Sequence, residues 1–320
     1  MKVAFFGTPQ FAAVTLERLL ESSHEVVCVV TQPDKPAGRG RKLQPPPVKQ
    51  IAEAAGIPVH QPASIKRTPL TDVLVASGAQ VAVVVAYGQI LPVRLLDALP
   101  FGFLNIHGSL LPKYRGAAPI QWAIANGETT TGVTIMQIDE GLDSGPVLAR
   151  AEAEILEDDD ARSIHDLLSL LGANTMLEVL DRIEAEGRVE STPQDHEQAT
   201  LAPLIKRDDA RIDWEWPPEK IICRVRGFLL WPGAFSEQDG TEIKLLAAEA
   251  VAPSWMTMNW KAREIVPGTI VDVLKGRGFI VKTGGDGLVL ITRIKIAGKK
   301  EMDADSAING GLIKIGMQLK

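Results

Sequence analysis

The chain has 320 residues, of which 45% are hydrophobic and 23% are charged, and its net charge at pH 7 is -6. This composition is typical of an ordinary globular protein, and the length favours two domains over one. The negative charge weighs against a general nucleic-acid binder. No apolar run is long enough to cross a membrane, and no signal peptide precedes the first strand-like segment, so we expect a cytoplasmic protein.

Cysteine usage weighs against a disulfide framework and a zinc site. The chain has two cysteines, Cys28 and Cys223, which lie far apart and lack the spacing of metal ligands. We expect both to be buried free thiols, and we expect no metal.

The first thirty residues predict a strand, a helix and a second strand, at 3–6, 11–20 and 26–30. A βαβ unit of this length indicates a parallel sheet with right-handed crossovers. A dinucleotide-binding turn would place glycines at G-x-G-x-x-G, but here Gly7 is followed by Thr-Pro-Gln-Phe, which disfavours NAD binding.

The same alternation of elements continues to residue 186. The uninterrupted apolar run at 81–86 predicts a central strand that is buried on both faces, ending where a ligand can lie. The other expected helices are 47–55, 70–76, 91–99, 117–126 and 160–186, and the other expected strands are 58–60, 103–107, 132–138 and 146–151.

A long basic loop at 33–50 interrupts this pattern. It carries Lys35, Arg39, Arg41 and Lys42 among prolines and glycines that exclude a continuous helix before Pro45. One reading is a solvated surface loop. Its unusual length for a strand-to-helix connection favours the other reading, a flexible segment that closes on phosphates.

The pattern becomes polar between 187 and 211 and then resumes with different elements. A helix is expected at 219–228, followed by short strands at 242–247, 268–273, 279–283 and 288–295. Strands at this spacing suggest a small β-barrel. We therefore predict an α/β domain at 1–188, a linker at 189–207 and a β-barrel domain at 208–320.

Residues suited to carbonyl chemistry gather at the end of the strand 103–107. Asn105 and His107 are two apart, so their side chains share one face of that strand. Asp143, between Gly141 and Gly145, can bring a carboxylate to the same place. Singly, each also has an ordinary reading: His107 as a structural hydrogen bonder, and Asn105 and Asp143 as turn residues.

Two other readings of polar residues are weaker. Ser109 lies near His107 in the sequence, which suggests a serine hydrolase as an alternative function. The nucleophile motif G-x-S-x-G of such enzymes is absent, however. The acidic run 157–160 lacks the glycine spacing of a calcium loop, so we interpret it as the start of a helix.

The combination of motifs is more informative. Asn105 begins the pattern Asn-x-His-x-Ser-Leu-Leu-Pro-x-x-Arg-Gly-x-x-Pro, which is followed by Gly-Val-Thr and by Gly-Leu-Asp-x-Gly at 141–145. Together they resemble the signature of the folate-dependent formyltransferases. The segments FFGTPQFA, TQPDKPAGRGRKL, VVVAYGQILP, RGAAPIQWAI, RIDW and WPGA narrow the likeness to the branch of that family acting on methionyl-tRNA, over nearly the whole chain. Leu201 departs from the pattern, where an aromatic residue is expected.

The resemblance implies a Rossmann-like, mostly parallel sheet domain followed by an OB-like barrel that helps to bind tRNA. It implies transfer of a formyl group from 10-formyltetrahydrofolate to the amino group of initiator methionyl-tRNA. Asn105 and His107 would stabilise the oxyanion, and Asp143 would tune His107 and relay protons.

The resemblance also implies binding residues. Those expected to bind folate are Tyr87, Gly88, Ile90, Leu91, Ser109, Leu110, Leu111, Pro112, Ile138, Asp139 and Gly141. Those expected to meet the tRNA acceptor stem are Arg39 first, and then Arg41, Lys42 and Lys35.

The remaining alternatives are another formyltransferase, acting on an amino sugar or a glycinamide nucleotide, a formyl-folate hydrolase, or a non-catalytic RNA-binding protein on the same fold. The basic loop and the C-terminal β domain disfavour the other enzymes, and the set Asn105, His107 and Asp143 disfavours the last. We expect a monomer.

Overall fold

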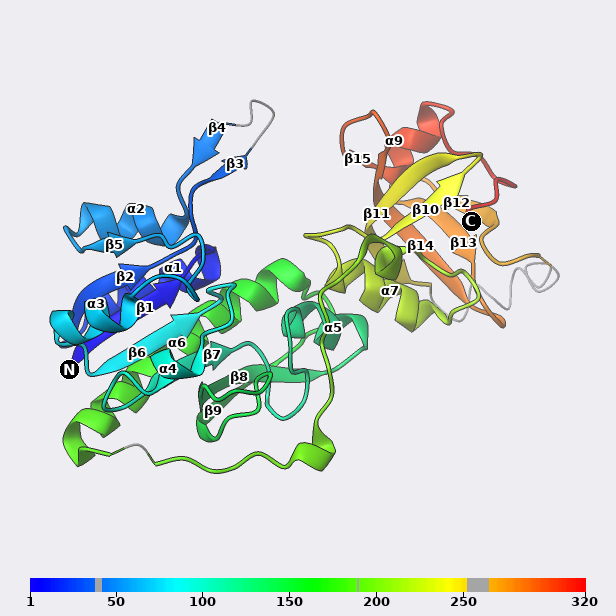
Figure 1. Ribbon diagram of the computed structural model, residues 1–320. Helices are drawn as coiled ribbons and strands as arrows, with labels where there is room; N and C mark the ends of the chain where they lie inside the picture. The colour runs from blue at the N-terminus through cyan, green and yellow to red at the C-terminus, as the bar shows by residue number, and fades with distance from the viewer. Residues whose placement is uncertain (38–41, 189, 252–264) are drawn as a thin grey trace. The chain divides into compact units, whose positions relative to one another are not determined.

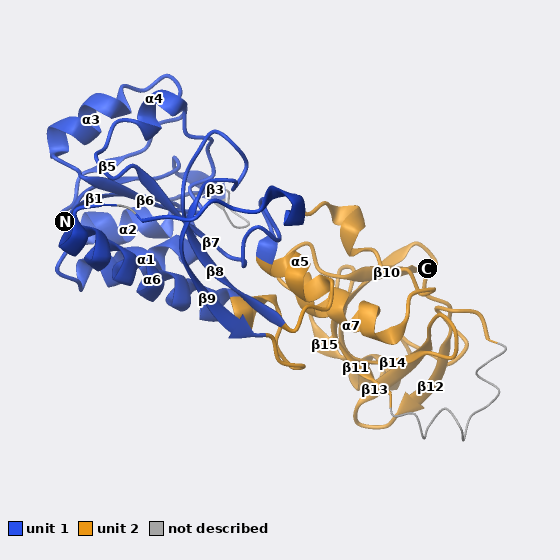
Figure 2. Ribbon diagram, turned by 90° about the horizontal axis from the view of Figure 1, so that it is seen from below, with its two compact units in different colours: residues 1–119, 130–154, 165–203 blue, residues 120–129, 155–164, 204–320 orange. Residues whose placement is uncertain are grey.

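The structure is a computed structural model that describes residues 1–37, 42–188, 190–251 and 265–320. The chain divides into two compact units, coloured separately in Figure 2. The first comprises residues 1–119, 130–154 and 165–203, and the second comprises residues 120–129, 155–164 and 204–320.

The first unit is built on a seven-stranded sheet with the order β5-β2-β1-β6-β7-β8-β9 (Figure 1). The first five strands in that order pair in parallel, whereas β8 pairs antiparallel with both β7 and β9. The strands are β1 (Lys2–Gly7), β2 (Glu25–Val30), β5 (Val59–His60), β6 (Val81–Val85), β7 (Phe103–His107), β8 (Thr130–Gln137) and β9 (Val147–Glu154). The prediction of a mostly parallel Rossmann-like sheet is confirmed.

Burial on both faces explains why these segments form the middle of the sheet. All five residues of β6 are buried, as an uninterrupted apolar run predicts. Alternate residues of β1 and β6, among them Phe6 and Val84, pack against Leu70 and Leu74 of α3 on one face. On the other face, the absent side chain of Gly172 in α6 leaves room for Ile106 of β7.

Helices connect the strands of this sheet. They are α1 (Gln10–Leu20), α2 (Pro47–Ala54), α3 (Leu70–Ser77), α4 (Val93–Leu96), α5 (Pro119–Ala125) and α6 (Ala161–Glu186). α5 groups with the second unit. Within the described ranges, no helix combines the length and the apolar character needed to cross a membrane.

The basic loop contains an element that the sequence did not predict. Residues Lys35–Ala37 (β3) and Lys42–Gln44 (β4) pair as a two-stranded antiparallel hairpin. Asp34 anchors its base, because its carboxylate accepts hydrogen bonds from Lys49 at 3.0 Å and from Gln61 at 2.7 Å. The hairpin therefore projects from a fixed point on the first unit.

The polar segment after α6 is bound along the first unit. We call residues 192–202 the strap. Its backbone pairs with Val147 through Thr192, with Pro112 and Arg115 through Thr200, and with Arg115 and Ala118 through Ala202. Part of the predicted linker thus borders the loop that follows β7.

The second unit is a curled antiparallel sheet with the order β10-β11-β14-β13-β12, and β15 pairs with β14. Its elements are α7 (Pro218–Gly227), β10 (Phe235–Gln238), β11 (Thr241–Ala250), β12 (Ile270–Leu274), β13 (Gly278–Lys282), β14 (Leu288–Ile296), β15 (Met302–Asp303) and α9 (Ala304–Asn309). Strands β10 and β15 and helix α9 are additions to the predicted elements. The prediction of a small barrel-like second domain is confirmed.

The core of the second unit explains this arrangement. Alternate residues of its strands, such as Ile243, Phe279 and Ile291, are fully buried with Ile221 of α7. Gly227 lets α7 approach α5 closely, because a side chain there would lie 2.8 Å from the Ala125 nitrogen.

Candidate functional site

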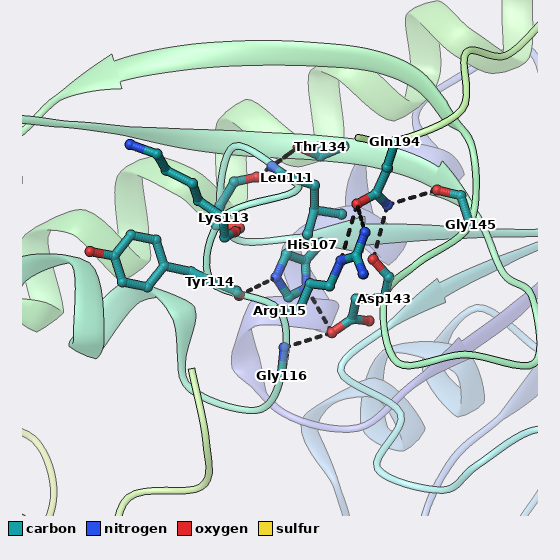
Figure 3. A network of polar contacts seen from close by, with 11 residues as sticks. His107, Leu111, Lys113, Tyr114, Arg115, Gly116, Thr134, Asp143, Gly145 and Gln194 are labelled. Carbon is teal, nitrogen blue, oxygen red and sulfur yellow. Dashed lines mark hydrogen bonds and ion pairs between the residues drawn. The ribbon is translucent and has the colours of Figure 1, made fainter. Parts of the chain in front are cut away.

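His107 ends strand β7 and is buried, and a single nitrogen of its ring is left for chemistry. Its Nε2 lies 2.9 Å from the carbonyl oxygen of Tyr114 (Figure 3). A carbonyl can only accept, so Nε2 carries a proton and donates it. Nδ1 is therefore the nitrogen that can gain or lose a proton.

Asp143 faces that nitrogen. Its Oδ2 lies 3.6 Å from Nδ1 of His107 and accepts a hydrogen bond of 2.8 Å from the backbone N–H of Gly116. The loop 138–146 begins beside Phe103, at the far end of β7, and runs back along the strand to bring Asp143 there. Asp143 adopts a left-handed backbone conformation with φ 47°, which is uncommon for residues with a side chain but which aspartate tolerates better than most.

Asn105 is the third predicted catalytic residue. It precedes His107 by two positions on β7, so the two side chains leave the same face of the strand. It is half-buried, and its side chain makes no hydrogen bond within the described ranges. The amide is thus available to a ligand.

The geometry of these three residues suits an acyl group that develops negative charge. When Nδ1 of His107 is also protonated, the imidazolium is stabilised by the Asp143 carboxylate and can donate to an oxyanion, together with the Asn105 amide. When Nδ1 is free, it and the second oxygen of Asp143 can accept a proton. The structure brings His107 and Asp143 together as the sequence suggested.

A side-chain network that has no signature in the sequence lies behind Asp143. Oε1 of Gln194, on the strap, accepts hydrogen bonds from Nε and Nη2 of Arg115, at 3.2 and 2.6 Å. Its Nε2 donates to the carbonyl oxygens of Asp143 and Gly145, at 2.9 and 2.7 Å. No local pattern around Gln194 signals these contacts, since its partners lie 49 to 79 residues away in the chain.

The residues predicted to bind folate fall into two groups. Tyr87, Ser109 and Leu111 are buried, and the Tyr87 ring packs edge-on against Phe6 in the core, where burial raises its pKa to about 12. The side chains of these three residues are covered by the rest of the protein. The others are at least partly accessible: Gly88, Ile90, Leu91, Leu110, Pro112, Ile138, Asp139 and Gly141.

Two of the four residues predicted to bind tRNA lie on the hairpin. Lys35 begins β3 and Lys42 begins β4, and both side chains are exposed. Arg39 and Arg41 lie outside the described residues. At the base, the hydrogen bond from Gln61, followed by that from Lys49, lowers the pKa of Asp34, so this anchor stays ionised at neutral pH.

Comparison with known proteins covers both units. The family model described as formyl transferase matches residues 1–180, and the model for the formyl transferase C-terminal domain matches residues 204–312. A methionyl-tRNA formyltransferase of a Synechococcus strain is 44% identical over 100% of this chain and 98% of its own. The corresponding protein of Geobacter metallireducens is 43% identical with the same coverage.

Solved structures share the fold at lower identity. HypX from Aquifex aeolicus in complex with tetrahydrofolic acid is 18% identical with a TM-score of 0.62, over 99% of this chain and 50% of that one. The sugar 3N-formyl transferase WlaRD, in the presence of dTDP and 5-N-formyl-THF, is 16% identical with a TM-score of 0.65, over 94% of this chain and 99% of that one.

Proposed function

The chain belongs to the methionyl-tRNA formyltransferase family, and from this membership we infer that it transfers a formyl group from 10-formyltetrahydrofolate to the α-amino group of initiator methionyl-tRNA. The product, N-formylmethionyl-tRNA, serves translation initiation. The observation that carries this inference is the pair formed by Asp143 and Nδ1 of His107, next to the side-chain amide of Asn105 on the same face of β7.

The pair accounts for the proton movements of acyl transfer to an amine. As the amine attacks the formyl carbon, negative charge develops on the formyl oxygen, and the Asn105 amide and the Nδ1–H of His107 donate to it. The free oxygen of Asp143 takes a proton from the attacking nitrogen, directly or through water. The same carboxylate returns a proton to the leaving nitrogen of the folate.

Two exposed apolar side chains support a folate cleft at the predicted loops. Ile90 follows β6 and is 81% exposed, and Leu142 precedes Asp143 and is 62% exposed. A ligand with an apolar ring system removes such side chains from water when it covers them, and this burial stabilises the complex. The cosubstrate supplies the activated formyl group, and the loops carrying Ile90 and Leu142 would orient it toward Asn105.

The remaining expectations rest on this function. We place Lys35, Arg39, Arg41 and Lys42 at the acceptor stem, because a basic projecting hairpin suits a phosphate backbone. We place the protein in the cytoplasm, where initiator tRNA is aminoacylated, and we expect a monomer of 34.6 kDa.

The test is an assay with 10-formyltetrahydrofolate and methionyl-tRNA, followed by measurement of N-formylmethionine. Asp143→Asn and His107→Ala are each expected to lower kcat by about 10²- to 10⁴-fold, the range for loss of a general acid–base group. Asp158→Asn, which changes an exposed carboxylate outside the site, is the matched control and should match the wild type.

Other acceptors separate the alternatives. The same assay with an amino-sugar nucleotide, with glycinamide ribonucleotide and without an acceptor measures the competing transfers and hydrolysis. Formylation of either small acceptor as efficiently as methionyl-tRNA would contradict the assignment, as would wild-type turnover by Asp143→Asn.

A further inference from the structure

Asp143 has a left-handed backbone conformation, which is uncommon for a residue with a side chain. Its φ is 47°, in the left-handed region that aspartate tolerates better than most residues with a side chain, so the contacts around this turn decide how firmly it is held. One such contact is known from the site, where the Gly116 N–H holds the carboxylate. A second contact holds the backbone of Asp143.

Gln194 supplies that contact. Its Nε2 donates to the carbonyl oxygens on either side of Ser144, those of Asp143 and Gly145, and so clamps the turn that carries the carboxylate. The amide is only 6% exposed, and each of its polar atoms has two partners. A fully satisfied buried amide is a rigid support.

Arg115 fixes the orientation of this amide. A guanidinium can only donate, so it forces Oε1 of Gln194 toward itself and Nε2 toward the loop. Arg115 is 8% exposed, and Nη2 also lies 3.0 Å from Nδ1 of His196 on the strap. Its side chain therefore contacts the strap and, through Gln194, the catalytic loop.

We propose that Gln194 is a positioning residue for the formyl-transfer reaction, which acts by holding Asp143 against His107. The proposal rests on the proposed function for its kinetic consequence. Its structural part, that Gln194 rigidifies residues 139–146, can be measured without any turnover. Both parts are tested on the full-length protein.

The kinetic test uses three substitutions. Gln194→Ala and Gln194→Met remove the two donors, and Gln194→Glu keeps the acceptor for Arg115 while losing both donors to the loop. All three are expected to lower kcat about 10- to 100-fold, since a displacement of about 1 Å in a catalytic group has this effect. KM for folate and for tRNA should change less than threefold. Gln198→Ala is the matched control, an exposed strap residue whose side chain donates a hydrogen bond to Asp195 and not to the catalytic loop.

A double-mutant cycle separates positioning from general support. If Gln194 acts through Asp143, then Gln194→Ala added to Asp143→Ala lowers kcat no further. Full additivity, or wild-type kcat in all three single variants, would overturn the proposal. So would a loss of kcat matched by a lower Tm and restored by assay at lower temperature.

Hydrogen exchange provides the measurement that does not depend on activity. In Gln194→Ala the backbone amides of residues 139–145 are expected to exchange at least tenfold faster, with those of α6 unchanged. Unchanged exchange in this loop overturns the clamp. Faster exchange in a protein whose wild type fails to formylate methionyl-tRNA would instead refute the proposed function and leave the clamp intact.

Discussion

His107 can stabilise an oxyanion in only one protonation state. Its Nε2 proton is bonded to the Tyr114 carbonyl, so Nδ1 must itself be protonated before it can donate to the substrate. The Asp143 carboxylate lies 3.6 Å from this nitrogen, close enough to stabilise the positive charge when the imidazolium forms. A change that moves Asp143 therefore acts on both proton transfer and charge stabilisation.

Gly116 allows the most direct test of this coupling. Its φ is 124°, and a side chain there would lie 2.6 Å from the carbonyl oxygen of Ala202 on the strap. Gly116→Ala must displace the N–H that holds Asp143, and we expect kcat to fall about 100-fold. Steady-state kinetics with methionyl-tRNA measures the effect.

A glycine in open space provides the control. Gly240 also has a positive φ, of 77°, but its substitution meets no atom within 4 Å. Gly240→Ala should cost about 1 kcal/mol of stability from backbone strain and leave kcat unchanged. Equal kinetics of the two alanine variants would show that Gly116 does not position Asp143.

At this scale, the sequence indicates residues by motif and misses those that act through non-local contacts. Asn105, His107 and Asp143 stand in a recognisable pattern. The backbone carbonyl of Tyr114 has no sequence signature, because every residue has a backbone carbonyl. Gln194 is a polar residue in a polar segment, and only the fold reveals that it is buried.

Among the elements, the hairpin β3–β4 is the clearest candidate for RNA contact. The overall charge is -6, so attraction to a polyanion must be local. Lys35 and Lys42 are exposed, and Leu43 beside them is 68% exposed, an apolar surface next to positive charge. The hydrogen bonds of Asp34 fix the base of the hairpin that carries these side chains.

Charge removal on this element tests the contact. Arg39→Ala and Lys42→Ala are each expected to raise KM for methionyl-tRNA, while folate binding measured by titration stays within twofold. Each should also reduce the slope of log KM against log salt by about 0.7 to 0.9, the value for one lost phosphate contact. Lys66→Ala, an exposed lysine elsewhere on the first unit, is the control. Equal effects on folate and tRNA would contradict the assignment.

The sequence predicts the helices and strands correctly where the pattern of hydrophobic residues determines the secondary structure. β6 and β7 follow from apolar runs, and α6 from its periodic leucines. The hairpin was not predictable, because Pro36 and the glycines near it resemble a structureless loop. The strap escaped prediction for another reason: its pairing with Arg115 depends on contacts 85 or more residues apart in the chain.

For the whole molecule, His24 makes stability depend on pH. Its side chain is buried near the Met1 ammonium, with Asp181 and Glu184 of α6 on its other sides. Burial, and then the Met1 ammonium, lowers the pKa of His24 below its usual 6.5. The folded protein therefore favours neutral His24, and the unfolded chain takes up a proton more readily.

The sign of the pH effect follows from this difference. Stability is fully present above pH 6.5 and declines as the pH falls below it, by at most about 1.4 kcal/mol per pH unit from this one residue. Urea unfolding between pH 5.5 and 7.5 measures the slope. His24→Gln should flatten it, and an unchanged slope in that variant would assign the effect to other groups.

The strap constrains how this protein can be recombined with its relatives. The family models leave residues 181–203 unmatched, which makes that stretch look like an interchangeable spacer. Yet it carries Gln194 and the backbone that borders Gly116. A chimera that exchanges the C-terminal domain should therefore be joined after Pro203. A junction near residue 188 would replace the strap, including Gln194, by that of the relative. The hybrid would then fold but transfer the formyl group slowly, because the contacts that hold the catalytic loop would have changed.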